Sequence, residues 1–283
     1  ADSPGGAGRR GPGFVLAAKP WGWYGHQGIS IHAKGWAARS PLLSPGNGGH
    51  HGLGLVSFTS ASGSARSEIR REAGTFAHAE VTFTAAPGGG TLLVSLDGGP
   101  EEEVSTSASR RGTGHFAAAA PGGAGRIVLR PKGDGEVTLH GVVLETGGPG
   151  VVYDAIGANG ASIHALNLLD EEGWVEALAL RGSDLVILNY GTNESSMEGI
   201  GGPRYEREYA RTIGRVRRAL PGASVLVMAP MDRGVRLPDG SVGTMPSIRR
   251  LVAVQRRIAR ENACAFFDTY SAMGGEGTMG RWY

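Results

Sequence analysis

Beyond residue 150, short apolar segments alternate with segments that repeat at helical spacing, and this alternation constrains the fold more than any other feature. The apolar segments span 151–156, 184–190, 223–229 and 264–268. Between them, 204–220 and 247–261 carry an apolar side chain every three or four positions. Continuous apolar strands that alternate with amphipathic helices are typical of a parallel sheet covered on both faces. The sequence therefore predicts an α/β fold for this half.

The preceding residues, from about 52 to 145, have a different pattern. Short segments of alternating polarity are separated by turn clusters such as Pro87-Gly88-Gly89-Gly90 and Asp97-Gly98-Gly99-Pro100. Strands spaced by turn signals, with no helical period between them, indicate an all-β sandwich or jelly roll. The expected strands are 53–59, 79–84, 91–96, 115–119, 126–130 and 136–144.

These two patterns divide the chain into three expected parts. Residues 51–147 form the β module, and 148–283 form the α/β domain. Residues 1–50 form a loop and aromatic segment that we assign to the α/β domain, so that the β module is an insertion. Three of the five tryptophans lie in this first part, and they either pack loops onto a domain face or line a substrate: Trp21, Trp23 and Trp36.

Composition and charge exclude several classes of protein. With 28 basic and 26 acidic residues, the net charge of +2 gives no overall electrostatic case for nucleic acid. The only cysteine, Cys264, excludes an internal disulfide and a cysteine-based zinc site. No run of 18 apolar residues predicts a membrane span. Only three basic residues are lysines, a bias that we attribute to genome composition: Lys19, Lys34 and Lys132.

Isolated polar features have ordinary interpretations. His50-His51 has no acidic or cysteine partner at ligand spacing, so we expect a solvated loop and no metal site. His164 is expected on the surface, with a place in the cleft as the alternative. The arginines of 204–220 and 247–261 are expected on solvated faces, with an anionic-polymer patch as the alternative. Asp154, in an expected buried strand, must be hydrogen-bonded or protonated.

The chemistry is expected where strands of the α/β half end, because ligands bind at the carboxyl ends of open parallel sheets. Three loops qualify: 157–160, 191–194 and 230–233. A side-chain amide such as that of Asn193 can donate to a developing oxyanion, and so can a backbone N–H of the neighbouring glycine-rich turn. None of these loops has a phosphate-binding glycine pattern.

In this order, the blocks resemble a known family. Gly157-Ala158-Asn159-Gly160, followed by Gly191-Thr192-Asn193-Glu194, is similar to the second and third blocks of the SGNH (GDSL-type) hydrolases. The resemblance is to a bacterial branch of peptidoglycan and polysaccharide O-acetylesterases, and it implies a flavodoxin-like three-layer domain with an inserted carbohydrate-binding-type β module. Further matching segments are 11–15, 20–24, 153–154, 230–233 and 267–279.

The resemblance also implies roles for individual residues. Gly160 would give a backbone N–H, and Asn193 a side-chain amide, to the oxyanion hole. Glu194 stands where the family usually has Asp, and we expect it to orient the loop only. The residues expected to line the substrate are Asn159, Gly191, Thr192, Glu194 and Asp232.

Two family blocks have no counterpart in this sequence. The family nucleophile is a serine in a Gly-Asp-Ser block, and its base is a histidine in an Asp-x-x-His block; neither pattern occurs here. Ser3 in Ala1-Asp2-Ser3 is not favoured, because no strand precedes it. We therefore interpret the chain, which starts at Ala1 without a visible signal peptide, as processed, trimmed or a fragment. It is expected to have little or no esterase activity alone.

The function that follows is carboxylic ester hydrolysis by serine acyl-enzyme chemistry. The expected substrate is an O-acetylated peptidoglycan or other polysaccharide, with no metal or organic cofactor, no nucleic acid and no membrane span. Alternatives are a polysaccharide O-acetyltransferase of the same fold and a non-catalytic glycan-binding protein. The implied substrate suggests a periplasmic or secreted location, and the oligomeric state is left open.

Overall fold

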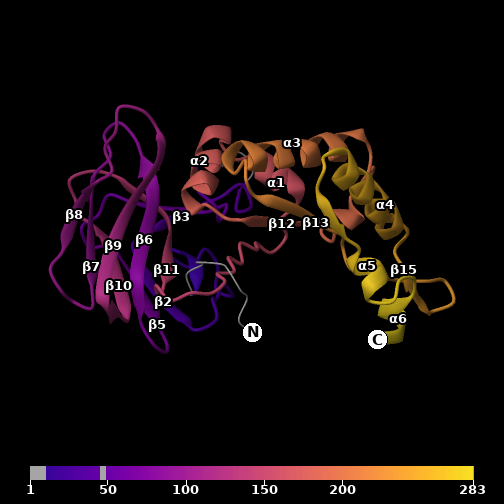
Figure 1. The fold of residues 1–283 in the computed structure, drawn as a ribbon, viewed down its shortest axis with the longest axis horizontal. Helices are drawn as coiled ribbons and strands as arrows, with labels where there is room; N and C mark the ends of the chain where they lie inside the picture. Colours follow the sequence, from indigo (N-terminus) through magenta and orange to yellow (C-terminus); the bar gives the residue numbers. More distant parts are fainter. Residues whose placement is uncertain (1–10, 45–48, 283) are drawn as a thin grey trace. The chain divides into compact units, whose positions relative to one another are not determined.

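The computed structural model describes residues 11–44 and 49–282 (Figure 1). Ser3 lies outside these residues. The chain divides into two compact units. The first unit comprises residues up to Ala158 together with Glu172–Ala177, and the second comprises Asn159–Glu171 and Leu178–Tyr283.

The first unit is built from two antiparallel sheets, which confirms the predicted β module. One sheet has the order β3-β4-β11-β6-β9, with β1 also paired to β11, and the other has the order β2-β5-β10-β7-β8. Buried side chains from both sheets, such as Phe58 and Leu129, form the core. The strands of the first sheet are β1 (Gly13–Leu16), β3 (Ala37–Arg39), β4 (Ser57–Ser60), β6 (Phe76–Ala85), β9 (Gly112–Ala124) and β11 (Val137–Glu145). Those of the second are β2 (Ile29–Lys34), β5 (Arg66–Arg71), β7 (Thr91–Leu96), β8 (Glu102–Ser105) and β10 (Arg126–Pro131).

Strand pairing places the early aromatic segment differently from the prediction. β1 pairs with β11, β2 with β5 and β3 with β4, so 13–39 belong to the sheets of the first unit and not to the α/β half. The reason is that Gly13–Leu16 is buried along its whole length and needs a sheet on which to pack. Asp154 Oδ1 accepts the Phe14 N–H at 2.8 Å, so this carboxylate is hydrogen-bonded as expected. The outer domain boundaries stay predictions.

The second unit contains a parallel sheet of order β12-β13-β16, which confirms the α/β class. Its strands are β12 (Leu185–Asn189), β13 (Ser224–Met228) and β16 (Ala265–Phe267). A small hairpin pairs β14 (Gly234–Arg236) with β15 (Val242–Thr244). The helices of this unit are α1 (Ile163–Asn167), α3 (Pro203–Ala219), α4 (Pro246–Glu261), α5 (Thr269–Ala272) and α6 (Thr278–Trp282), with a 3₁₀ turn at Glu194–Ser196. Helix α2 (Glu171–Arg181) is shared, because its residues Glu172–Ala177 belong to the first unit. The two helices with the strongest sequence pattern are therefore confirmed as α3 and α4.

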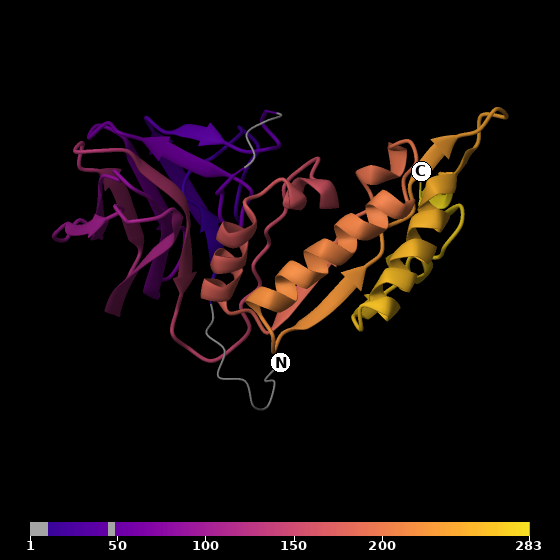
Figure 2. The same cartoon turned by 90° about the horizontal axis from the view of Figure 1, so that it is seen from above.

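Helices cover one face of this sheet, where coverage of both faces was predicted. Figure 2 shows α3 and α4 side by side along the strands. Leu188 and Val227, which are register partners, are buried on that face, and Tyr209 Oη of α3 donates to the Leu188 carbonyl at 3.0 Å. On the opposite face, Leu185 and Ile187 are 50% and 41% exposed, so the described residues leave β12 uncovered there.

Residues 151–156 do not form the strand that their apolar run predicts. They have no strand assignment, and Val151 and Tyr153 are 81% and 72% exposed. A strand needs a hydrogen-bonded neighbour, and β12 pairs only with β13 among the described residues. The run is apolar enough for a buried strand but has no partner.

Arg215 fixes α1 against α3 from a position that the sequence assigned to a solvated face. The side chain is almost fully buried, and its Nη1 donates to the Leu166 carbonyl at 2.7 Å, with Nη2 donating to the Asp170 carbonyl at 3.2 Å. Burial lowers the pKa of the Arg215 guanidinium to about 10. Because α1 follows the Asn159–Gly160 turn, this contact also helps to position that turn.

The histidine pair expected in a solvated loop is buried in the first unit. His50 Nε2 lies 2.9 Å from Thr113 Oγ1, and His51 Nδ1 lies 2.9 Å from Ser57 Oγ. In each ring, one nitrogen lies within hydrogen-bond distance of a hydroxyl of the sheet, which lowers the cost of burying it. Within residues 11–44 and 49–282, no group of three histidine, cysteine or acidic side chains is placed to hold a metal.

His140 is completely buried beside this pair. Its Nε2 lies 2.9 Å from Thr84 Oγ1, and its ring centroid lies 5.2 Å from that of His50. Burial, and secondarily the charges of His50 and His51, hold the pKa of His140 well below 6.5. The folded state therefore keeps this ring neutral.

The free energy of unfolding is expected to fall as the pH is lowered through about 6.5, the ordinary histidine pKa. Below that pH the unfolded state binds a proton at position 140 that the folded state rejects, so the loss approaches about 1.4 kcal/mol per pH unit. Urea unfolding at several pH values measures this slope. His140→Gln should flatten it and exposed His115→Gln should not; equal slopes in both variants would contradict the assignment.

Candidate active site

Two of the three predicted loops lie at the same edge of the parallel sheet. β12 ends at Asn189 and leads into 191–194, and β13 ends at Met228 and leads into 230–233. The Asn159–Gly160 turn reaches this edge through a side chain, because Asn193 Nδ2 donates to the Ala161 carbonyl at 2.7 Å. The structure therefore brings the turn that contains Gly160 next to Asn193.

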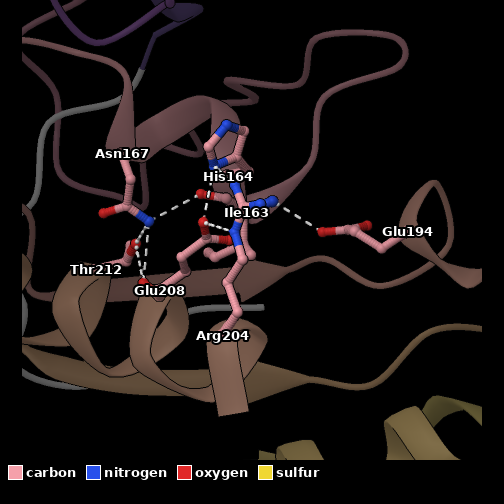
Figure 3. Close-up of polar contacts among 7 residues, drawn as sticks. All are labelled: Ile163, His164, Asn167, Glu194, Arg204, Glu208 and Thr212. Carbon is pink, nitrogen blue, oxygen red and sulfur yellow. Dashed lines mark hydrogen bonds and ion pairs between the residues drawn. The ribbon is translucent and has the colours of Figure 1, made fainter. Parts of the chain in front are cut away.

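One buried carboxylate fixes both loops. Glu194 is 2% exposed; its Oε1 accepts the Ile163 N–H at 2.8 Å, and its Oε2 accepts the Gly191 N–H at 2.9 Å. Figure 3 shows the contact between Glu194 and Ile163. Two charge-assisted hydrogen bonds to backbone donors compensate for removing this charge from water. Glu194 is thus placed to hold the loops in register.

Gly191 allows the second loop to approach the neighbouring segments closely. Its φ of +124° is one that side-chain-bearing residues rarely adopt. A Cβ there would lie 3.0 Å from Gln255 Nε2 and 3.1 Å from Pro230 Cδ. No larger residue fits this position without displacing one of these neighbours.

Gln255 of α4 supports the same loop from behind, a role that the sequence did not reveal. The fully buried Nε2 donates to the Tyr190 carbonyl and to Tyr205 Oη, each at 2.7 Å. Burial raises the pKa of Tyr190 and that of Tyr205, so both phenols stay protonated. The helical pattern placed Gln255 on the inner stripe of its helix, but only tertiary packing shows what it contacts.

The third loop is tied to the second by Arg233. Its Nη1 donates to Ser195 Oγ at 2.7 Å and to the Thr192 carbonyl at 3.1 Å. Asp232 is buried, and its Oδ2 accepts the Met279 N–H of α6 at 2.9 Å. The Asp232 carboxylate therefore contacts the backbone of α6.

The residues expected to line the substrate fall into two groups. Asn159 and Thr192 are exposed at the loops, as is Gly160, whereas Gly191, Glu194 and Asp232 are buried. The first group is accessible to a ligand. The buried residues contact the protein itself, and the family roles of all of them stay predictions.

His164 belongs to a half-exposed polar cluster between α1 and α3 (Figure 3). Its Nδ1 lies 2.8 Å from Glu208 Oε1, and Arg204 Nε donates to the same oxygen at 3.0 Å. Among the described residues of the second unit, no serine hydroxyl is hydrogen-bonded to a histidine. In this part of the structure, an asparagine amide therefore lies beside a glycine-containing turn, and the described histidine is paired with a carboxylate.

At this edge of the parallel sheet, the contact with Ala161 brings the Asn193 amide next to a glycine-containing turn. The model of the GDSL-like lipase/acylhydrolase family matches residues 132–283. The chain belongs to this family.

One solved structure shares the fold of nearly the whole chain, and others are similar only at low TM-scores. A structure titled "Peptidoglycan O-acetylesterase in action" is 24% identical, with a TM-score of 0.79, over 96% of this chain and 73% of its own. A family two carbohydrate esterase from Clostridium thermocellum is 14% identical over 85% of this chain and 89% of its own, with a TM-score of 0.30. A family 29 carbohydrate binding module is 13% identical over 47% of this chain and 87% of its own, with a TM-score of 0.31. No curated protein sequence matches the chain significantly.

Replacing Glu194 tests whether its carboxylate holds the two loops. Glu194→Gln leaves one acceptor oxygen and sets an amide donor against a backbone donor, so we expect a loss of about 2–3 kcal/mol in local stability. Amide hydrogen exchange at Ile163 and Gly191, followed by NMR, should accelerate at least about tenfold. The matched control is exposed Glu198→Gln, four positions along; equal exchange in both variants would refute the role.

Proposed function

We propose that this chain contributes the oxyanion hole of a serine esterase that removes O-acetyl groups from peptidoglycan or another polysaccharide. Membership of an acylhydrolase family and the fold shared with a peptidoglycan O-acetylesterase support the reaction class. The observation that carries the proposal is the Asn193–Ala161 contact, which brings the asparagine amide to the turn containing Gly160. The acetylated glycan as substrate, and a periplasmic or secreted location, follow from this proposal.

The reaction would proceed through an acetyl-enzyme. A serine oxygen attacks the acetyl carbonyl, and the resulting oxyanion accepts hydrogen bonds from the Gly160 N–H and the Asn193 amide. The intermediate collapses and releases the sugar hydroxyl, and water then cleaves the acetyl-serine to acetate. An asparagine amide has two hydrogens, so Asn193 can donate one to Ala161 and the other to the oxyanion.

The nucleophile and the base would come from residues outside this sequence, which contains neither a Gly-Asp-Ser nor an Asp-x-x-His block. A serine without a base within hydrogen-bond reach is a weak nucleophile.

None of the helices in the described residues is long and apolar enough to cross a bilayer.

The 283-residue chain alone is expected not to hydrolyse 4-nitrophenyl acetate above the buffer rate. The physical reason is the missing serine–base pair. A fluorophosphonate probe, which labels activated serines, should leave the chain unlabelled. Turnover that the probe abolishes would show that the chain holds its own nucleophile.

In a protein that joins this chain to both missing blocks, Asn193→Ala should lower kcat by about 10²–10³, or roughly 3 kcal/mol, with little change in KM. The loss concerns a donor that acts mainly in the transition state. Steady-state kinetics on an acetylated glycan gives the two parameters. Asn262→Ala, at the far end of α4, is the matched control, and an equal loss there would remove the oxyanion assignment.

A further inference from the structure

A pocket of about 390 Å³ lies in the first unit, where the edge strands of its two sheets meet. β2 is the last strand of one sheet and β3 the last strand of the other, and Gly35 and Trp36 connect them. Gly35 has a φ of +76°, and a Cβ there would lie 3.0 Å from Ala65. The tight turn therefore holds the two edge strands in place around the pocket.

The polar side of this pocket carries the positive charges of two lysines. Lys19, Lys34 and His32 line it, all three are exposed, and no acidic residue is among the lining residues. The nearest carboxylate along the ladder, that of Glu68 opposite His32, pairs with Arg66 at 2.9 Å and Arg70 at 3.3 Å. Neither lysine has an ion pair with another described residue.

The lysines of this chain are concentrated at the pocket. The chain has 28 basic residues and only three lysines, and two of the three line this one pocket. The third, Lys132, pairs with Glu103 at 2.8 Å elsewhere in the same unit. A lysine ammonium is a compact charge with three rotatable donors, and it suits a carboxylate reached from varying directions.

The other side of the pocket is apolar. Phe58 and Ile31 are buried in its wall, beside the partly buried Trp36. The Trp36 indole N–H is buried and has no hydrogen-bond acceptor among the described residues. Because this nitrogen is buried, a ligand in the pocket would meet the ring of Trp36 and not its N–H.

We propose that this pocket binds a sugar residue that carries a carboxylate, with its ring against the apolar wall and its carboxylate between Lys19 and Lys34. The pairing of a flat apolar surface with a cationic rim selects for a ligand that has both a C–H face and a negative charge. The inference rests on the proposed function only in taking a glycan as the ligand. It concerns binding and not ester cleavage.

Titration calorimetry of the 283-residue chain tests it with two matched ligands. One is a disaccharide that contains glucuronic acid, and the other is the same disaccharide after reduction of its carboxyl group to an alcohol. We expect the acid to bind at least about tenfold more tightly than its neutral form, and to lose affinity at high salt.

Three variants locate the site. The double variant Lys19→Gln/Lys34→Gln should weaken binding of the acid at least about tenfold. Trp36→Ala should also weaken it, and Trp36→Phe should restore part of the affinity. Lys132→Gln is the matched control, because it removes the only other lysine, and it should leave binding unchanged.

Several outcomes would overturn the proposal. These are no binding of either ligand, equal affinity for both, equal loss in the Lys132 variant, or acetate binding as tightly as the sugar acid. None of these outcomes bears on the esterase proposal, which is tested by hydrolysis. A failed esterase test would likewise leave the measured affinities intact.

Discussion

The candidate site depends on one buried negative charge. A carboxylate removed from water is destabilising unless it is hydrogen-bonded, and Glu194 meets that condition only when the 161–163 segment and the Gly191 turn are both in place. The two loops therefore stabilise each other through a single side chain. Such mutual dependence favours one arrangement of the loops, which is what a preorganised oxyanion hole requires.

This carboxylate matters more here because the glycine turn does not follow a strand. The apolar run at 151–156 has no hydrogen-bonded neighbour, and the outer face of β12 exposes Leu185 and Ile187. A turn anchored on a strand would inherit the rigidity of the sheet. Here its position comes from Glu194, from Asn193 through Ala161, and from the buried Arg215 that fixes α1.

The regular elements could be predicted because the polarity of their residues repeats with the period of a strand or of a helix. β7 was predicted at 91–96 and lies there, and α3 and α4 follow their helical stripes. β5 and β8 were missed because Arg66–Arg71 and Glu102–Ser105 are rich in charged residues. These segments form strands because they pair with neighbouring strands, and their own sequence does not show it. The same limit explains two of the wrong predictions, those for 151–156 and for the histidine pair. An apolar run predicts burial but not a partner, and a histidine pair gives no sign of the hydroxyls that His50 and His51 reach across the sheet.

The residues of the candidate site also fall into those that the sequence reveals and those that only the structure reveals. Local motifs predicted roles for Gly160 and Asn193 and the loop-orienting position of Glu194, because these residues lie in glycine-rich turns with a recognisable order. Gln255 and Arg233 could not be found in this way, since their partners lie 65 and 38–41 positions away in sequence. Such long-range donors act on the backbone of the loops and leave no local pattern.

Asn193 is known from both kinds of observation. Its motif suggests a catalytic amide. Its contact with Ala161 shows that one of the two amide hydrogens already holds the neighbouring turn. An amide fixed by one hydrogen bond loses less freedom when it forms a second, so the contact with Ala161 would favour the proposed hydrogen bond to an oxyanion.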